Sequence, residues 1–387
     1  MATMLTIDST PSAINAVYDD VNGIKFSLTS GNANIVAVRG DLYVNGSYTT
    51  TIDGVQVLGT TDEFAFDVRK IMQSVLVSEL RTNITTLAVT DAVTSAAEIK
   101  MRFFEIVLSG GVYTHTWGED GAGTNYLESS NYDVVNMARQ PDEALSDWTV
   151  DDGTKELLTL RTDGCKIPRG VPFQIGFLGS DSNYVVNVVE RDLNLNSINS
   201  TTSGTLASLS YSKGIAEIPA STFSNSNTAY IDVKIQKHTV GDRSITYRFK
   251  VVDYCDLFTI FIQNHLGDFE HYDFGAKVVK NISTKNQSIK KPLTSSYSSW
   301  DAGEIITTST TTERVKVQTG ALSQADLTFL QEFIKNHSVV YRWISANNFK
   351  RYVVKSHSTK VEDNDGVINS MSLTLEPSNN HKVQDGD

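Results

Sequence analysis

The chain has few of the residues that build disulfide scaffolds or metal clusters. Its 387 residues include two cysteines, Cys165 and Cys255, which lie far apart in the sequence. Their separation matches no common zinc motif and excludes a disulfide-rich domain, so assembly in a reducing cytosol fits the composition. Neither cysteine has an adjacent histidine that could activate a thiolate. Cys255 stands beside apolar, strand-like residues and is expected to be a small buried hydrophobe.

Long apolar runs and targeting signals are also missing. No stretch approaches the roughly 18 apolar residues that a membrane helix needs. Residues 1–12 lack the basic stretch and apolar core of a signal peptide. We therefore expect a soluble chain with no membrane anchor.

Clusters of positive charge are scarce. The chain has 33 Lys and Arg against 45 Asp and Glu, a formal net charge of -12. The pair Lys290 and Lys291 is too short for a nucleic-acid patch, because such a patch works by releasing many counterions from phosphates. The composition predicts no surface that grips DNA, although an acidic wall would let DNA slide past without sticking.

Catalytic motifs are absent as well. The sequence has no G-x-S-x-G elbow, and no glycine-rich phosphate loop follows a strand. The glycines of 118–123 are interrupted by Glu119 and Asp120, whose charges would repel a phosphate. The pairs Glu119–Asp120 and Asp151–Asp152 would serve a glycosidase only at the right separation in space, and adjacent acids in turns are usually solvated. We assign no catalytic residue and predict that the protein is not an enzyme.

The densest polar cluster spans nine positions. It contains His265, Asp268, Glu270, His271 and Asp273, a set of donors that zinc or manganese could accept. The histidines are six positions apart, which fits neither a helical pair nor an HExxH site. In a strand–turn–strand segment the side chains would point to different faces. We predict a polar turn with satisfied hydrogen bonds, and assign no metal-binding or cofactor-binding residue.

Short apolar–polar alternations separated by turn residues are what the sequence does contain. Hydrophobic residues make up 40% and charged residues 20%, enough apolar matter for a packed interior. The length predicts two or three domains. We predict a mainly β fold, with immunoglobulin-like β-sandwich modules followed by an α+β C-terminal domain that packs one helix on an antiparallel sheet.

Residues 1–115 are predicted to form a β-sandwich with one inserted helix. Asn45-Gly46 is a strong hairpin signal, because both positions of a type I′ turn need positive φ. Apolar residues at helical spacing follow Asp67, which is placed as the N-cap. The expected strands cover 24–28, 35–38, 42–44, 64–66 and 99–108, and the helical face comprises Val68, Ile71, Met72, Val75 and Leu76.

Residues 116–228 are predicted to form a second β-rich, sandwich-like domain. Strands are expected at 157–160, 173–178 and 184–189. The segment from Asn194 to Asn227 is rich in Ser, Thr and Asn. It is expected to be a long loop or exposed hairpin, either a contact arm or a plain solvent loop.

Residues 229–387 are predicted to form an α+β assembly domain. Ser323 caps one helix, with Asp326 three residues on. The buried stripe of that helix is expected to be Leu327, Leu330, Phe333 and Ile334. Strands are expected at 230–235, 246–252, 257–262, 339–344, 352–354 and 367–375.

The last third of the chain also carries a family pattern. Cys255-Asp256 precedes the apolar run 258–262, and Asn264, Gly267, Phe269, Tyr272 and Phe274 follow; then come 313–320, the capped helix, 339–341 and 372–376. This pattern resembles virion proteins of tailed bacteriophages that infect Bacteroidota, the crAss-like phages and their relatives. The first region of this chain resembles the immunoglobulin-like modules that precede this pattern in those virion proteins. One departure is Asp268, which stands where such proteins often have a second glycine.

The resemblance implies a structural subunit of the tail, neck or baseplate. Such a subunit would bind copies of itself in a closed homo-oligomeric ring, contact other tail or neck proteins, and let DNA pass through the lumen. It would be assembled in the host bacterial cytoplasm and reside in the virion. The alternative is a carbohydrate- or receptor-binding tail protein, in which Trp117, Trp148 and Trp300, near turns, would stack on sugars.

Overall fold

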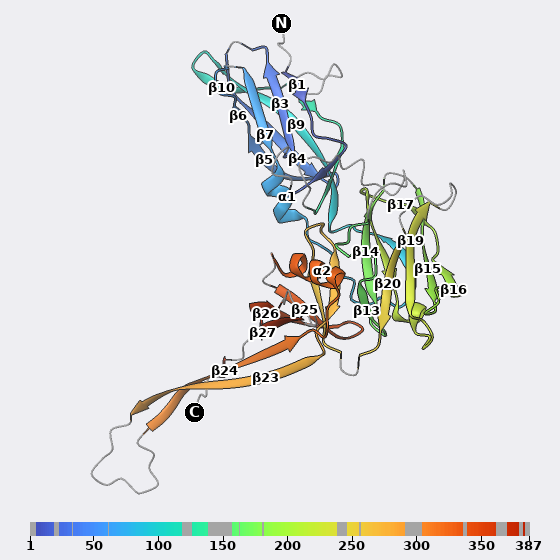
Figure 1. The fold of residues 1–387 in the computed structure, drawn as a ribbon. Helices are drawn as coiled ribbons and strands as arrows, with labels where there is room; N and C mark the ends of the chain where they lie inside the picture. Colours follow the sequence, from blue (N-terminus) through green and yellow to red (C-terminus); the bar gives the residue numbers. More distant parts are fainter. Residues whose placement is uncertain are drawn as a thin grey trace, which may run out of the picture.

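The fold is mainly β and comprises two β-sandwiches followed by an α+β unit (Figure 1). This is the predicted fold class, including the immunoglobulin-like sandwiches and the helix on an antiparallel sheet. The computed structural model describes residues 5–18, 23–32, 34–60, 62–117, 126–137, 157–161, 163–179, 182–237, 246–254, 257–290, 304–335, 339–360, 370–378 and 382–383.

The first sandwich packs two sheets over an aromatic core. The ring of Phe103 lies 5.6 Å from that of Phe26 and 5.1 Å from that of Phe66, so the two sheets meet through these side chains. One sheet orders β1 (Leu5–Ser9), β3 (Lys25–Ser30), β7 (Glu63–Asp67) and β6 (Val55–Gln56); the other orders β2 (Ile14–Ala16), β12 (Tyr132–Val135), β9 (Ala96–Ser109), β4 (Ile35–Val44) and β5 (Ser47–Asp53), with β10 (Val112–Trp117) and β11 (Leu127–Glu128) also on β9.

Two expected strands, 35–38 and 42–44, are one continuous strand, β4. Gly40 lies in the middle of β4 because a Cβ there would come within 2.5 Å of Met101, so the glycine allows close packing and does not mark a turn. The Asn45-Gly46 turn is confirmed. Both residues have positive φ, 50° and 74°, and they join β4 to β5.

The inserted helix is α1 (Arg69–Val75), and its N-cap is Val68 rather than the predicted Asp67. The Asp67 carboxylate still accepts the backbone N–H of Arg69 at 3.0 Å. The Asp67 side chain therefore acts from the expected residue, one position before the observed N-cap. Val68 is instead buried in the sandwich core, where its backbone N–H donates to the carbonyl of Ile24.

The second sandwich also has two sheets. One orders β13 (Lys166–Pro168), β20 (Tyr247–Val252), β19 (Tyr230–Lys237), β15 (Ser182–Arg191) and β16 (Ser197–Thr202), with β17 (Leu206–Ser208) on β15; the other orders β14 (Phe173–Leu178), β18 (Lys213–Ile218) and β8 (Ala88–Asp91). The chain therefore leaves the first sandwich after α1, adds β8 to the second, and returns.

Strand pairing moves both expected domain boundaries. β12 pairs with β2 and β9, so the first sandwich extends to residue 135 rather than 115. β19 and β20 pair within the second sandwich, so the third unit begins after residue 252 rather than at 229. A local pattern shows that a segment is a strand, but the strand it pairs with depends on packing against residues that are distant in the sequence.

The segment Asn194–Asn227 is not the long loop or single hairpin that its composition predicts. It contains β16, β17, β18 and the 3₁₀ turn Ala220–Phe223. β18 has five buried residues out of six, because it lies between β14 and β8. Its exposed parts include β16 and most of β17.

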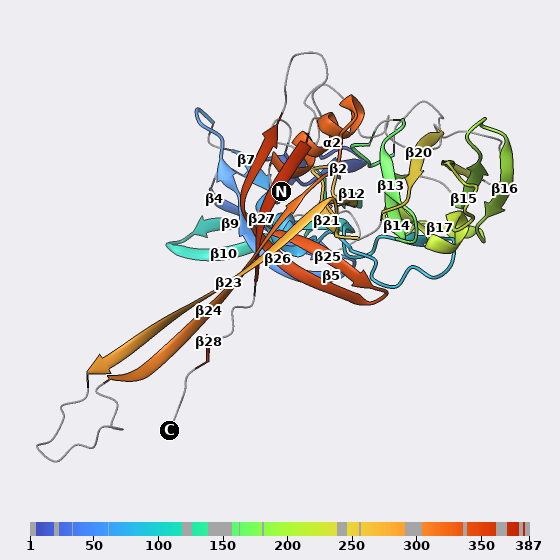
Figure 2. The ribbon, with the colours of Figure 1, turned by 60° about the horizontal axis from the view of Figure 1, so that its bottom comes forward.

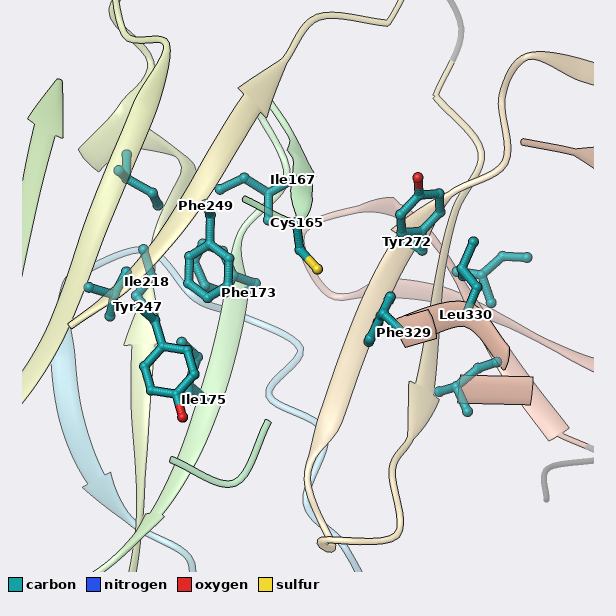
Figure 3. Close-up of a cluster of buried hydrophobic side chains, with 14 of the residues drawn as sticks. Cys165, Ile167, Phe173, Ile175, Ile218, Tyr247, Phe249, Tyr272, Phe329 and Leu330 are labelled. Atoms are coloured by element: carbon teal, nitrogen blue, oxygen red, sulfur yellow. The ribbon is translucent and has the colours of Figure 1, made fainter. Parts of the chain in front are cut away.

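The third unit is one antiparallel sheet with the helix α2 (Gln324–Lys335) on it. Its strands run β22 (Phe269–Asp273), β21 (Thr259–Gln263), β25 (Val339–Ser345), β26 (Asn348–Lys360), β27 (Ser370–Pro377), β24 (Glu304–Gln318) and β23 (Lys277–Lys290), with β28 (Lys382–Val383) on β24. Its core is continuous with that of the second sandwich. Figure 3 shows Phe173 and Phe249 on one side and Tyr272, Phe329 and Leu330 on the other.

The predicted cap of α2 is confirmed. The backbone N–H of Asp326 donates to Ser323 Oγ at 3.1 Å, and the backbone N–H of Ser323 donates back to Asp326 Oδ2 at 3.3 Å. Leu327 and Leu330 are buried as expected, and so is Phe329, which the predicted stripe omitted. The side chains of Phe333 and Ile334 lie outside the described residues.

Candidate functional site

The polar segment 265–273 lies at the junction of the three units. The turn 264–268, which includes His265, connects β21 to β22, and the carbonyl of Gly267 accepts from Lys213 Nζ at 2.8 Å and from Ser78 Oγ at 3.0 Å. Lys213 belongs to β18 of the second sandwich, and Ser78 to the connection that leaves the first. Asn136, just after β12, donates from its side-chain amide to Ser78 Oγ at 3.1 Å. One turn therefore holds three units together.

Asp268 extends this network into the second sandwich. Its carboxylate accepts from Gln174 Nε2 at 2.6 Å and from the backbone N–H of Gly176 in β14. Burial raises the pKa of Asp268, while the nearby Lys213 opposes that shift. Burial lowers the pKa of Lys213 to about 8, against the pull of Asp268 and Glu79. These two side chains are buried structural groups that link strands.

Glu270 and Arg161 bind the segment to the strand-like stretch before β13. The Glu270 carboxylate accepts from Thr159 Oγ1, from the backbone N–H of Leu160 at 3.0 Å and from Asn264 Nδ2 at 3.0 Å. Arg161 donates to the carbonyl of His271. Burial is the main cause that raises the pKa of Glu270 and lowers that of Arg161.

His271 and Asp273 are also built into the fold. Burial lowers the pKa of His271 well below its usual value, so the ring is neutral, and it stacks on Phe261 at 5.1 Å. The Asp273 carboxylate accepts the backbone N–H groups of Phe258 at 2.9 Å and Gly275 at 2.7 Å. The predicted polar turn is thus followed by a strand whose carboxylates bind separate partners. In the described part of the chain, Nε2 of His271 is buried without a hydrogen-bond partner.

The segment does not gather its donors around one point. Successive side chains of β22 alternate between its two faces, which separates Glu270 from His271 and Asp273. Within the part of the chain that the structure describes, no three His, Cys, Asp or Glu side chains are placed to hold a metal ion. The segment therefore acts as a structural junction, and the candidate functional surface lies elsewhere.

The longest exposed feature is the β-hairpin formed by β23 and β24, here called the ribbon (residues 277–290 and 304–318). Fourteen residue pairs join its strands, from Lys277↔Gln318 to Lys290↔Glu304. Figures 1 and 2 show it projecting away from the body of the molecule. At about 3.3 Å per residue, β23 is roughly 45 Å long. The base of the ribbon enters the core through Val315 and Val317.

The ribbon exposes apolar side chains over much of its length. All fourteen residues of β23 are exposed, including Ile282 at 72% and Ile289 at 60%. An isolated two-stranded hairpin is marginally stable in water, because neither face is covered. The ribbon was not predicted from the sequence. The available signal was two long runs rich in Lys, Thr, Ser, Asn, Ile and Val, without proline.

Comparisons with known proteins found similarity only to solved structures, with low TM-scores. No family model and no curated protein matches the chain. Among solved structures, the fibronectin(III)-like modules of Clostridium thermocellum CbhA are similar at 12% identity over 65% of this chain and 95% of that chain, with a TM-score of 0.16. A chain in the complex of Dpr2 Ig1-Ig2 with DIP-Theta Ig1-Ig3 is similar at 8% identity over 97% of this chain and 90% of that chain, with a TM-score of 0.20.

A third similarity is to an enzyme. The β-glucuronidase of Parabacteroides merdae shares 9% identity over 64% of this chain and 24% of the enzyme, with a TM-score of 0.16. Scores this low carry no argument about function. The glucuronidase activity belongs to that enzyme and is not transferred to this chain.

The remaining sequence candidates are mostly outside the described residues. These are Glu119, Asp120, Asp151, Asp152, Trp148, Trp300, Cys255 and Lys291, together with the side chain of Trp117. Cys165 is buried in the core beside β13. Over the described residues, none of the helices has the length and apolar character to cross a membrane.

Proposed function

We propose that the chain is a structural subunit of a bacteriophage virion that assembles into a ring of the tail, neck or baseplate. The observation that carries the proposal is the ribbon, a long two-stranded sheet with exposed Ile282 and Ile289 and little support from its own chain. Covering such a surface with another protein removes apolar area from water and stabilises the hairpin. The net charge of -12 supports a lumen that lets DNA pass.

The buried polar segment 265–273 is a second observation that supports the proposal. Glu270, Asp268 and Asp273 are buried carboxylates, and each accepts hydrogen bonds from the protein. Asp268 and Glu270 join the third unit to the second sandwich and the stretch before it, and the carbonyl of Gly267 joins it to Ser78. A rigid body with a projecting ribbon suits a subunit whose task is to hold shape in an assembly.

The test is the size of the purified protein in solution, measured by light scattering and negative-stain micrographs. We expect closed rings for the native chain. Ile282→Ser with Ile289→Ser should shift the population toward monomer. The matched control is Val55→Ser with Leu58→Ser, which removes similarly exposed apolar side chains from the first sandwich and should leave the rings intact. A native chain that stays monomeric at all concentrations contradicts the proposal.

A further inference from the structure

The ribbon carries charge opposite to that of the rest of the chain. Residues 277–318 contain seven Lys and Arg against three Asp and Glu, a net charge of +4. The whole chain is -12, so the remainder is -16. A second copy of the same chain is therefore a partner of complementary charge.

The positive charges lie on an open edge. β23 ends its sheet, and Lys277, Lys280, Lys285 and Lys290 are exposed along it. Lysines on an edge strand oppose indiscriminate strand pairing, because an uncharged partner would leave them unpaired. A surface that receives this edge must offer carboxylates as well as apolar area.

A cleft at the end of the second sandwich offers both. It is an open cleft of about 590 Å³ where the β15–β16 turn meets the ends of β13 and β20. Leu193 and Ile198 line it and are 77% and 36% exposed. Asp192 and Asp253 add two carboxylates to the same lining.

The charges of the cleft favour a cationic ligand. Among the described residues that line it, the one cation is Arg169, which already binds Asp253, with Nε 2.6 Å from Oδ1. Asp192 accepts the backbone N–H groups of Asn194 and Asn196, both at 2.8 Å. Hydrogen bonds from Asn196 are the largest cause that lowers the pKa of Asp192, which keeps the carboxylate charged.

The cleft and the ribbon lie on opposite sides of the molecule. In Figures 1 and 2 the ribbon projects to one side, and β15 and β16 of the second sandwich lie on the other. A chain cannot place its own ribbon in its own cleft in this arrangement. Contacts from one copy to the next are then head-to-tail, and a head-to-tail interface produces a ring when its rotation closes.

We propose that the ribbon of one copy docks in this cleft of the next copy. Lys280 and Ile282 lie two residues apart on the same face of β23, and Asp192 and Leu193 are neighbours in the cleft. The lysine faces the carboxylate while the two apolar side chains cover each other. This inference rests on the proposed self-assembly and specifies its interface.

The experiment mixes two tagged single variants, Leu193→Cys and Ile282→Cys, under mild oxidation and measures disulfide-linked dimers of mixed tag. The matched control mixes Leu58→Cys with Ile282→Cys, since Leu58 is fully exposed but lies in the first sandwich. We expect about tenfold more mixed dimer from the first pair, because docking raises the effective concentration of two neighbouring thiols. Reduction should separate the dimers.

The outcomes separate this inference from the proposed function. Rings with Leu58–Ile282 linkage, with Ile282–Ile282 linkage between ribbons, or with equal linkage in both mixtures overturn the cleft and leave the ring proposal standing. Absence of rings in the native chain overturns both. A second measurement uses Asp192→Asn, which keeps the side-chain shape but removes the charge. It should weaken association several-fold, and an unchanged dissociation constant would contradict the docking contact.

Discussion

The carbonyl group of Gly267 accepts hydrogen bonds from Lys213 and Ser78, while its missing side chain makes room for Asn136. A Cβ at Gly267 would lie 1.4 Å from the backbone oxygen of Asn136. The backbone also has a φ of 78°, which side chains rarely adopt. Two independent physical constraints thus meet at one residue, at the place where three units join.

Gly267→Ala should destabilise the protein far more than a glycine substitution in an open turn. Gly46→Ala is the matched control, because Gly46 has a similar φ of 74° and a Cβ added there would meet no other atom within 4 Å. Positive φ alone costs about 1–2 kcal/mol, whereas the clash adds several kcal/mol typical of overpacking. Urea unfolding measures the free energy of unfolding of both variants. Equal decreases would show that the backbone around Gly267 shifts to accommodate a Cβ at little cost.

Lys213 predicts a specific dependence of stability on pH. Burial lowers its pKa to about 8, below the 10.5 of a solvated lysine. Between these values the unfolded chain binds more protons than the folded chain, so the free energy of unfolding rises with pH. The full effect is on the order of 3 kcal/mol. Urea titrations from pH 7 to pH 10.5 should show this rise.

Lys213→Met should remove most of that rise, because the group that releases the proton is gone. Lys285→Met changes an exposed lysine of the ribbon and should leave the rise unchanged. If Lys213→Met keeps the slope of the native chain, another group causes the pH dependence.

At the scale of elements, the capping residue Asp326 of α2 also contacts a strand distant in the sequence. Asp326 completes the capping box with Ser323, as the sequence predicts. It is also fully buried, accepts the backbone N–H of Lys166 at 3.1 Å, and lies 3.2 Å from Lys166 Nζ. The cap therefore joins α2 to β13 of the second sandwich.

Removal of Asp326 should cost more than removal of the cap alone. Ser323→Ala should lower the free energy of unfolding by about 1 kcal/mol, the usual value of an N-cap. Asp326→Ala should cost about 2–4 kcal/mol, since it also leaves partly buried donors of Lys166 without this acceptor. Denaturant unfolding of the two variants gives the comparison. A smaller loss for Asp326→Ala would show that the contact with β13 adds nothing.

Strands with alternating or strongly apolar residues were predictable, and strands with neither pattern were not. β14 is buried throughout and was expected at 173–178 from its apolar run. β3 and β7 alternate buried and exposed residues, and both were placed closely from the sequence. β23 has no buried residue and β18 has five of six, so neither shows alternation. The ribbon and the interior of the Asn194–Asn227 segment were missed for this reason.

At the scale of the whole molecule, the ribbon and the remaining surface differ in charge, which predicts a salt-sensitive assembly. The Debye length falls from about 10 Å at 0.1 M salt to about 3 Å at 1 M, so attraction between Lys280 and an acidic neighbour is screened. Sedimentation velocity should show fewer rings as NaCl rises over this range.

Two variants separate the charged from the apolar contribution to this assembly. Lys280→Gln with Lys285→Gln should flatten the salt dependence, because fewer charges remain to be screened. Ile282→Ser with Ile289→Ser should weaken assembly at every salt concentration. Rings that grow more stable with salt would indicate that apolar contact alone drives association.

The sequence alone determined the fold class, the Asn45-Gly46 turn and the cap of α2, because these depend on the alternation of residues and on backbone preferences over a few positions. It also determined that 265–273 is a polar segment, in which Asp268, Glu270 and Asp273 accept hydrogen bonds. Only the tertiary structure decided which strands pair, that this segment joins three units, and that the ribbon projects from the body. The junction depends on contacts between residues far apart in the sequence, such as Ser78 with Gly267, and no local pattern encodes the partner of a strand.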